Sequence, residues 1–297
     1  MGALDGRICI ITGAGRGIGR EHARLFAAEG AQVVVNDNGS AADGTGHDPA
    51  VAEAVVKELV DAGGVAVGSS ADVSTMAGAQ SVLDLALEAF GDVHVVVNNA
   101  GVLRDKMFAN MSEEDWDAVI AGHLKTTFCM SRVACGRWRD ENKAGKAVNA
   151  AIVNTSSTSG LIGSVGQTNY GAAKAAIASF TMILAMEAQR YGVRVNAISP
   201  AARTRMTEDS PGTKDLVKKP DDPSEFDVFH PRHVPPVVAY LASADCPLTG
   251  RVFMVKGGDI RPFVPWQRMP WIARPEHFTV ADVAELMKSV PDVPVSP

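Results

Sequence analysis

The sequence has few aromatic residues, few cysteines and no surplus of positive charge. Of its 297 residues, 6% are aromatic and 4 are cysteine. Lysine and arginine total 28 against 34 acidic residues, which gives a formal net charge of −6. Because binding to nucleic-acid phosphates needs a cationic surface, this balance disfavours a nucleic-acid partner. The hydrophobic share of 46% is also too high for a disordered chain.

The cysteines show neither metal-ligand nor disulfide spacing. They are isolated from one another, and none belongs to a Cys-x-x-Cys pair. We therefore expect no metal site, and we interpret the thiols as buried or free in a reducing compartment. The sequence also lacks a secretory signal, a Ser-Lys-Leu peroxisomal address and an uninterrupted apolar run of the ~18 residues that a membrane helix needs. We expect a cytoplasmic protein without a membrane partner.

Short apolar runs alternate with helix-length segments along most of the chain. The runs expected to form strands are Ile8–Thr12, Gln32–Asn36, Val65–Gly68, Val93–Asn98, Ala151–Thr155, Val193–Ile198 and Val252–Val255. The segments expected to form helices are Gly17–Glu29, Pro49–Ala62, Ala77–Phe90, Glu113–Asn142, Tyr170–Tyr191 and His233–Ala242. This pattern predicts an α/β Rossmann fold, with a doubly wound sheet of seven parallel strands and helices on both faces.

Three segments depart from the alternation. Asn38–Asp48 is rich in Gly, Asp and Ser and is interpreted as a loop, and Thr204–Pro231 is interpreted as a mobile flap. After Gly258, prolines interrupt an aromatic stretch, and a short helix is expected at Val280–Lys288. The length allows one domain or two, and the motif order favours one. We therefore expect a domain at residues 1–258 and an extension at 259–297 that packs on the core or on a neighbouring subunit.

A glycine-rich turn follows the first expected strand and opens the first expected helix. It runs Gly13-Ala-Gly-Arg16-Gly17-Ile18-Gly19. Glycines in this place let the backbone approach a pyrophosphate at the positive end of a helix, although a plain structural turn is the alternative. The turn therefore predicts a dinucleotide site.

Asp37 follows the second expected strand, about 20 residues beyond the turn, where a carboxylate binds the adenosine ribose hydroxyls. Because a carboxylate repels a 2′-phosphate, Asp37 favours NAD over NADP. Two alternatives remain open: Asp37 merely starts a turn, or Arg16 partly offsets the preference. Asp72-Val73 and Asn99-Ala100-Gly101 follow the third and fourth strands, at the edge where open α/β sheets bind ligands.

Tyr170 and Lys174 lie one helical turn apart, and Ser157 follows the fifth expected strand. A phenol with a pKa of about 10 is a poor proton acceptor near neutrality, and a nearby cation lowers that pKa. The Ser157 hydroxyl is placed to bind a substrate oxygen. Taken singly, Ser157 is as well explained as a helix cap, and Tyr170 with Lys174 as a solvated pair.

Together these motifs resemble the short-chain dehydrogenase/reductase family. The glycine turn, Asn98-Asn-Ala-Gly101, Ser157 and Tyr170-Gly-Ala-Ala-Lys174 carry the resemblance over roughly residues 5–260. It implies hydride transfer at the nicotinamide C4, with Tyr170 as general acid/base and Ser157 as orienter of the substrate oxygen. Lys174 would lower the Tyr170 pKa and bind the nicotinamide ribose. Further residues implied to contact the cofactor are Pro200, Ala202 and Thr204.

Two departures from the family pattern narrow the resemblance. His123 stands where Asn is usual, and it either serves the proton relay of that Asn or is a packed helix residue. Ala201 follows Pro200 where Gly is usual. The surrounding motifs, and the tail with Trp266 and Arg268, resemble the (3R)-hydroxyacyl-CoA dehydrogenase part of peroxisomal multifunctional enzymes, a relationship that also includes 17β-hydroxysteroid oxidation.

We therefore expect an NAD-dependent dehydrogenase that acts on a secondary alcohol, either a CoA-linked 3-hydroxyacyl group or a hydroxysteroid. A biosynthetic 3-ketoacyl reductase and a non-catalytic NAD-binding protein are the alternatives. The resemblance also implies a homodimer or homotetramer built on two helices with apolar faces. The apolar residues of those helices are Phe128, Met130, Ile177, Phe180, Ile183 and Leu184. Lys214, Lys218 and Lys219 either steer a CoA phosphate or are solvated loop charges.

Overall fold

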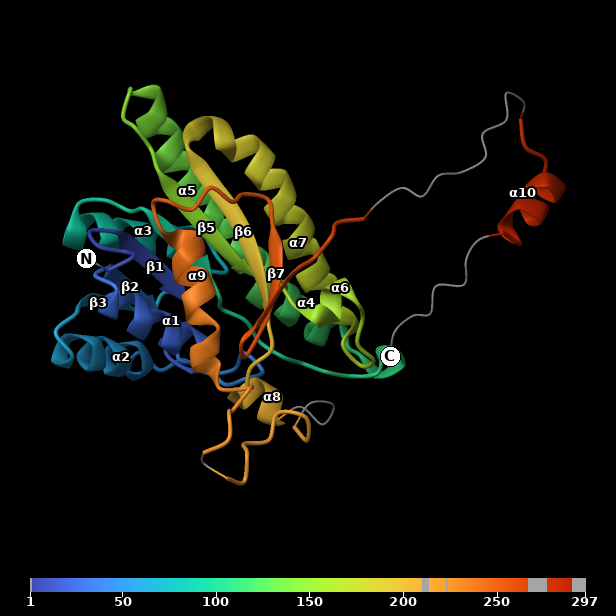
Figure 1. Ribbon diagram of the computed structural model, residues 1–297, viewed down its shortest axis with the longest axis horizontal. Helices are drawn as coiled ribbons and strands as arrows, with labels where there is room; N and C mark the ends of the chain where they lie inside the picture. The colour runs from blue at the N-terminus through green and yellow to red at the C-terminus, as the bar shows by residue number, and fades with distance from the viewer. Residues whose placement is uncertain (1, 210–213, 223, 267–276, 290–297) are drawn as a thin grey trace.

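A computed structural model describes residues 2–209, 214–222, 224–266 and 277–289. Its centre is one sheet (Figure 1). The strand order in this sheet is β3-β2-β1-β4-β5-β6-β7-β8. The strands are β1 (Ile8–Thr12), β2 (Gln32–Asn36), β3 (Val65–Ser69), β4 (Val95–Asn98), β5 (Ala150–Thr155), β6 (Val193–Pro200), β7 (Val252–Lys256) and β8 (Asp259–Pro262). The predicted doubly wound α/β fold is confirmed.

The prediction of seven parallel strands is wrong in one respect, because the sheet has an eighth strand that is antiparallel. Strands β1 to β7 pair in parallel, but β8 pairs with β7 in the antiparallel direction. The tight turn between them includes Gly257, which has a φ of 55°, in the left-handed region that favours glycine. The start of the expected C-terminal extension therefore forms an edge strand of the sheet.

Helices cover both faces of the sheet (Figure 1). On one face lie α1 (Gly17–Ala28), α2 (Ala50–Asp61) and α9 (Pro235–Ala242), and on the other lie α3 (Met76–Phe90), α5 (Thr126–Lys143) and α7 (Thr168–Ala188). Each layer buries its own apolar cluster against the sheet. Phe26 of α1 and Trp138 of α5 are among the largest buried side chains. Burial of one such side chain contributes about 1.5–3 kcal/mol.

The expected helix Glu113–Asn142 is interrupted. Helix α4 (Glu113–Ile120) begins at a capping box between Ser112 and Asp115, and α5 begins at Thr126. Between them, Ala121–Lys125 forms a π-helical turn, η2. Such a turn changes the direction of the side chains and is frequent at functional sites. Here it carries His123.

The remaining helical segments of the described residues are short, and some of them lie in the flap. They are α6 (Thr158–Leu161), α8 (Arg205–Asp209) and the 3₁₀ turns η1 (Phe108–Asn110), η3 (Gln189–Tyr191) and η4 (Pro231–His233). The flap is therefore partly ordered into helical turns. Helix α7 with η3, Thr168–Tyr191, is long and apolar enough to cross a membrane by length and composition, with a mean hydropathy of 1.3. This is weak evidence for a span, because α7 packs against β6 as a core helix does.

The expected C-terminal helix is present as α10 (Val280–Met287), which begins at a capping box between Thr279 and Asp282. Helix α10 has no buried residue and lies apart from the sheet in Figure 1. Arg268 and the prolines at 270 and 275 lie outside the described residues. For the part of the extension beyond β8, the expectation that it packs on the core or on a neighbour therefore stays a prediction.

Candidate active site

A cavity of about 950 Å³ opens at the carboxyl ends of the strands, beside the point where the strand order changes direction between β1 and β4. Ligands bind at this kind of position in doubly wound sheets. All the residues predicted to act in catalysis or to contact the cofactor line this cavity: Gly13, Arg16, Gly17, Ile18, Gly19, Asp37, Asp72, Val73, Asn99, Ala100, Gly101, His123, Ser157, Tyr170, Lys174, Pro200, Ala202 and Thr204.

The glycine-rich turn is shaped by close backbone approaches. Gly13 and Gly17 have φ values of 61° and 53°, in the left-handed region that favours glycine. A Cβ at Gly13 would lie 2.7 Å from the Cα of Ala100, and one at Gly19 would lie 2.0 Å from the Gly13 carbonyl oxygen. The turn therefore presents backbone at the amino end of α1, where the helix dipole favours an anionic group.

Asn99 stabilises this turn through hydrogen bonds. Its side-chain Nδ2 donates to the carbonyl oxygen of Gly13 at 3.0 Å, and its backbone N–H donates to Thr12 Oγ1 at 3.1 Å. The Thr12 hydroxyl also accepts from the backbone of Ala100 at 3.1 Å. The loop after β4 is thus fixed to the end of β1. Asn99 lines the cavity, and its side chain holds the turn in shape.

The Asp37 carboxylate is held in one orientation. Its Oδ2 accepts from the Gly15 backbone N–H at 2.8 Å, and its Oδ1 accepts from Gly39 at 2.8 Å. The Arg16 guanidinium donates to the carbonyl oxygen of Ser40 at 3.0 Å. Asp37 therefore acts as more than a turn starter, because it joins the inserted loop to the glycine-rich turn while facing the cavity.

The inserted loop forms a wall of the cavity that was not predicted from the sequence. Ser40, Ala41, Asp43 and Gly44 line the cavity, and the Arg104 Nε donates to the Asp43 carbonyl oxygen at 2.9 Å. The Gly- and Asp-rich composition indicated a loop, but it did not predict that the loop lies along the cavity.

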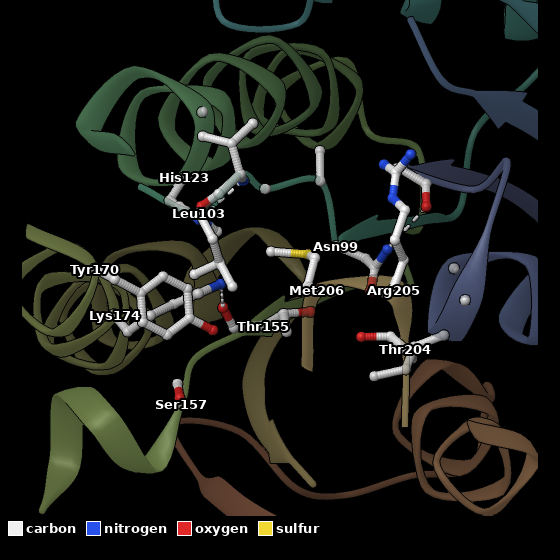
Figure 2. Close-up of a pocket in the computed structure, with 18 of the residues that line it drawn as sticks. Asn99, Leu103, His123, Thr155, Ser157, Tyr170, Lys174, Thr204, Arg205 and Met206 are labelled. Atoms are coloured by element: carbon white, nitrogen blue, oxygen red, sulfur yellow. Dashed lines mark hydrogen bonds between the residues drawn. The ribbon is translucent and has the colours of Figure 1, made fainter. Parts of the chain in front are cut away.

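Tyr170 and Lys174 lie on the same face of α7, and Ser157 lies at the start of α6 (Figure 2). The Lys174 Nζ donates to the Thr155 carbonyl oxygen at 2.6 Å and lies 5.5 Å from the centroid of the Tyr170 ring. Burial raises the pKa of Tyr170 to about 12, with the Ser157 hydrogen bond acting in the opposite direction. Burial also lowers the pKa of Lys174 to about 7.

The direction of the Tyr170 shift is opposite to the one expected from the sequence. We expected Lys174 to lower the pKa of the phenol. In the structure, burial penalises the charged form of both groups, and for Tyr170 it outweighs the opposing effect of the Ser157 hydrogen bond. The interpretation of Tyr170 and Lys174 as a solvated surface pair is wrong, because the Lys174 side chain is buried beside the phenol.

Ser157 combines the two interpretations offered from the sequence. It is the N-cap of α6, and its Oγ accepts from the Ser159 backbone N–H at 3.2 Å. A hydroxyl that accepts one bond still has a proton to donate. That proton is available to the Tyr170 side of the cavity, where Ser157 and Tyr170 interact. Ser157 therefore caps α6 and also presents its hydroxyl as a hydrogen-bond donor on the Tyr170 side of the cavity.

His123 is a neutral packed imidazole at the cavity wall. Its Nε2 lies 2.6 Å from the Val102 carbonyl oxygen, to which it donates in one tautomer, and 3.1 Å from the Val102 backbone nitrogen, whose N–H it accepts in the other. Burial, and then the charge of Lys174, hold the pKa of His123 well below its usual value. Its ring lies edge-on to Tyr170, with 5.1 Å between the centroids. A role as a positively charged proton carrier is disfavoured, and the interpretation as a packed residue gains support.

Apolar side chains form another part of the cavity lining. Leu103 follows β4, Met206 comes from α8, and Val217 and Phe229 come from the flap (Figure 2 shows Leu103 and Met206). Arg203 forms an ion pair with Asp227 and donates to the Val217 carbonyl oxygen at 3.1 Å. These contacts hold the described part of the flap over the cavity.

The flap lysines lie on the outside. Lys214, Lys218 and Lys219 are exposed, and Lys218 pairs with Asp215 at 3.0 Å. This arrangement favours solvated loop charges over a phosphate-steering cluster.

Comparisons with known proteins agree with this geometry. The short chain dehydrogenase family model matches residues 7–215. The chain is 43% identical over 260 residues to the hydroxyacyl-CoA dehydrogenase ChsB1 of Mycobacterium tuberculosis, with 86% of this chain and 79% of that protein covered. It is 38% identical over 265 residues to the peroxisomal multifunctional enzyme type 2 of Mus musculus, covering 89% of this chain and 33% of that enzyme.

A crystal structure of a short chain dehydrogenase from Mycobacterium avium superposes with a TM-score of 0.84 at 48% sequence identity, covering 97% of this chain and 96% of that one. The resemblance to the peroxisomal multifunctional enzymes is thus confirmed. The chain belongs to the short-chain dehydrogenase/reductase family, whose members are oxidoreductases that act on hydroxyl groups with a nicotinamide cofactor.

Proposed function

We propose that the protein oxidises a secondary alcohol to a ketone with NAD as the hydride acceptor. One observation carries the proposal: Ser157, Tyr170 and Lys174 line the same cavity as the glycine-rich turn and Asp37. The complete set of polar groups for proton transfer speaks against a non-catalytic NAD-binding protein, because cofactor binding alone does not require a phenol beside the Ser157 hydroxyl.

The chain's own residues account for the movement of the proton. The substrate loses a hydride from its carbinol carbon and a proton from its hydroxyl oxygen. A bound nicotinamide would accept the hydride, and the Tyr170 phenolate accepts the proton. The Ser157 hydroxyl donates to the substrate oxygen and orients it. Because burial raises the pKa of Tyr170 to about 12, formation of the phenolate depends on nearby positive charge. Lys174 supplies that charge when its Nζ is protonated, and burial lowers the pKa of Lys174 to about 7.

The orientation of Asp37 supports NAD over NADP. Two backbone N–H groups hold its oxygens, so the carboxylate cannot swing away from a cofactor ribose without breaking both bonds. A 2′-phosphate there would meet a fixed negative charge. Arg16, the residue that would offset this repulsion, donates to Ser40 instead.

For the substrate, we propose a 3-hydroxyacyl-CoA or a hydroxysteroid. The apolar wall formed by Leu103, Met206, Val217 and Phe229 suits the aliphatic part of either molecule. The alternative is a 3-ketoacyl reductase in biosynthesis, which the fixed Asp37 disfavours if that reductase uses NADPH.

We also propose a homodimer or homotetramer built on α5 and α7. The structure divides the apolar faces of these helices: Met130 and Ile177 are in the core, while Phe128 and Ile183 are 45% and 49% exposed. A groove of about 660 Å³ lies beside them, lined partly by Phe128, Phe180 and Leu184. Light scattering should show an oligomer that Ile183→Glu weakens, and a monomeric wild type would contradict the proposal.

The experiment that tests the activity is a turnover panel. Purified protein is incubated with NAD or NADP and a series of 3-hydroxyacyl thioesters, hydroxysteroids and simple secondary alcohols, and formation of reduced cofactor is measured by absorbance. We expect NAD reduction with at least one class and little with NADP. Binding of NAD without turnover of any alcohol would favour the non-catalytic alternative.

A further inference from the structure

The side-chain amide of Gln167 is fixed beside the catalytic serine. Gln167 precedes α7 and lines the same cavity as Ser157 and Tyr170. Its Oε1 accepts from the Ser159 hydroxyl at 2.7 Å, and its Nε2 donates to Asp105 Oδ2 at 2.9 Å. Both ends of the amide are therefore held.

This network determines which end of the amide is the donor. A carboxylate only accepts hydrogen bonds, so the NH₂ group of Gln167 must face Asp105. An amide NH₂ group has two N–H bonds, and Asp105 is its one hydrogen-bond partner among the described residues. The second N–H is therefore available to a molecule in the cavity.

Gln167 is also connected to Ser157 by two hydrogen bonds that Ser159 donates. The Ser159 backbone N–H donates to Ser157 Oγ at 3.2 Å, and the Ser159 hydroxyl donates to Gln167. Because Gln167 lines the same cavity as Ser157 and Tyr170, its fixed NH₂ donor shares that cavity with a substrate oxygen bound by those two residues. Such a donor suits a substrate with two oxygens a short distance apart.

The side chain of Gln167 is not required to hold the two segments that it joins. The backbone N–H of Lys106 already donates to the Gly166 carbonyl oxygen at 2.9 Å, and residues 106 and 167 form a β-bridge. A backbone clamp is thus in place between the loop after β4 and the start of α7. The additional amide, facing the cavity, is better explained by ligand recognition.

We propose that Gln167 is a specificity-determining residue that binds the carbonyl oxygen of a β-hydroxyacyl substrate while Ser157 and Tyr170 bind its hydroxyl. In a 3-hydroxyacyl thioester the carbonyl carbon lies two bonds from the carbinol carbon, so the two oxygens lie close together. A hydroxysteroid with an isolated hydroxyl has no second oxygen there. The inference rests on the proposed dehydrogenase function and selects between its two substrate classes.

A matched pair of substrates tests this inference. One is a 3-hydroxybutyryl thioester, and the other is the thioether in which CH₂ replaces the carbonyl. We expect the wild type to oxidise the thioester with a kcat/KM at least about tenfold higher, because a site built to bind an oxygen rejects the analogue that lacks it. Gln167→Leu should reduce that preference by about tenfold, the loss expected when one substrate hydrogen bond is removed.

Controls separate the possible failures. Gln80→Leu, which removes an exposed glutamine that bonds to Asp84 on α3, should keep the wild-type preference. Ser159→Ala removes the partner of the Gln167 oxygen and should reduce the preference part of the way. Equal kcat/KM values for thioester and thioether in the wild type would overturn the inference even if no variant folds. Failure to oxidise any alcohol would overturn the proposed function instead.

Discussion

The His123 imidazole lies against Gly101 so closely that a Cβ on residue 101 would lie 2.0 Å from His123 Cε1 and 2.5 Å from Nδ1. The ring has little room to retreat, because Nε2 is bonded to Val102 and the ring edge meets Tyr170. The absence of a side chain at residue 101 is therefore what allows a histidine at residue 123.

We expect Gly101→Ala to lower the free energy of unfolding by about 1–3 kcal/mol, the range for overpacking a core. Gly258→Ala is the control, since a Cβ there meets nothing within 4 Å. The double variant Gly101→Ala/His123→Ala should recover part of the loss. Chemical denaturation measures all four proteins, and equal stability of the two single variants would contradict the packing argument.

The pH dependence of stability should report the buried Lys174. Its pKa is lowered from 10.5 to about 7 by burial, so the folded protein binds fewer protons than the unfolded chain between these values. The contribution of Lys174 to the free energy of unfolding is therefore lowest below pH 7, and it increases as the pH rises toward 10.5. We expect the wild type to gain stability relative to Lys174→Met across this window. Urea denaturation at several pH values measures the difference, and parallel curves would contradict the burial of a lysine that titrates there.

Asn169 should position Tyr170 without touching the substrate. Its buried side chain donates to the Arg104 and Asp115 carbonyl oxygens at 3.1 and 3.2 Å, and its Oδ1 accepts from the Tyr170 backbone at 2.7 Å. We expect Asn169→Leu to lower kcat by about 10- to 100-fold, because small displacements of a catalytic group are costly. NAD affinity should change little. Steady-state kinetics and cofactor titration separate these effects, with the exposed Asn142→Leu as control.

Asp37 should determine the cofactor preference. We expect Asp37→Ser to raise the ratio of kcat/KM with NADP to that with NAD by at least about tenfold, because one repulsive charge is removed. Asp61→Ser, at the exposed end of α2, should leave the ratio at the wild-type value. An unchanged ratio in Asp37→Ser would show that the carboxylate does not face the 2′ position.

The cavity was largely predictable from the sequence, because its residues follow strands. Parallel strands end at one edge of a sheet, so motifs after successive strands converge there without knowledge of side-chain packing. Gly13, Asn99 and Ser157 were brought together for this reason. Strand β8 was missed because Asp-Ile-Arg-Pro has little of the apolar composition that marks a strand, and its pairing with β7 is a long-range feature.

Other features depend on burial and could not be predicted from spacing. The interval between Tyr170 and Lys174 predicts that they are neighbours but not that burial raises the pKa of the phenol. The π-turn at His123 leaves the apolar pattern of a helix nearly intact, so the break between α4 and α5 was not expected. The path of the inserted loop depends on individual contacts, such as that of Arg104 with Asp43, which composition does not reveal.

The most direct test of the account is the Tyr170→Phe variant, assayed in parallel for alcohol-dependent NAD reduction and for NAD binding. Removal of one hydroxyl should lower turnover by at least about 100-fold, the lower range for general-base catalysis, while NAD binds as it does to the wild type. Retained turnover in a folded Tyr170→Phe protein would contradict the assignment of Tyr170 as the proton acceptor.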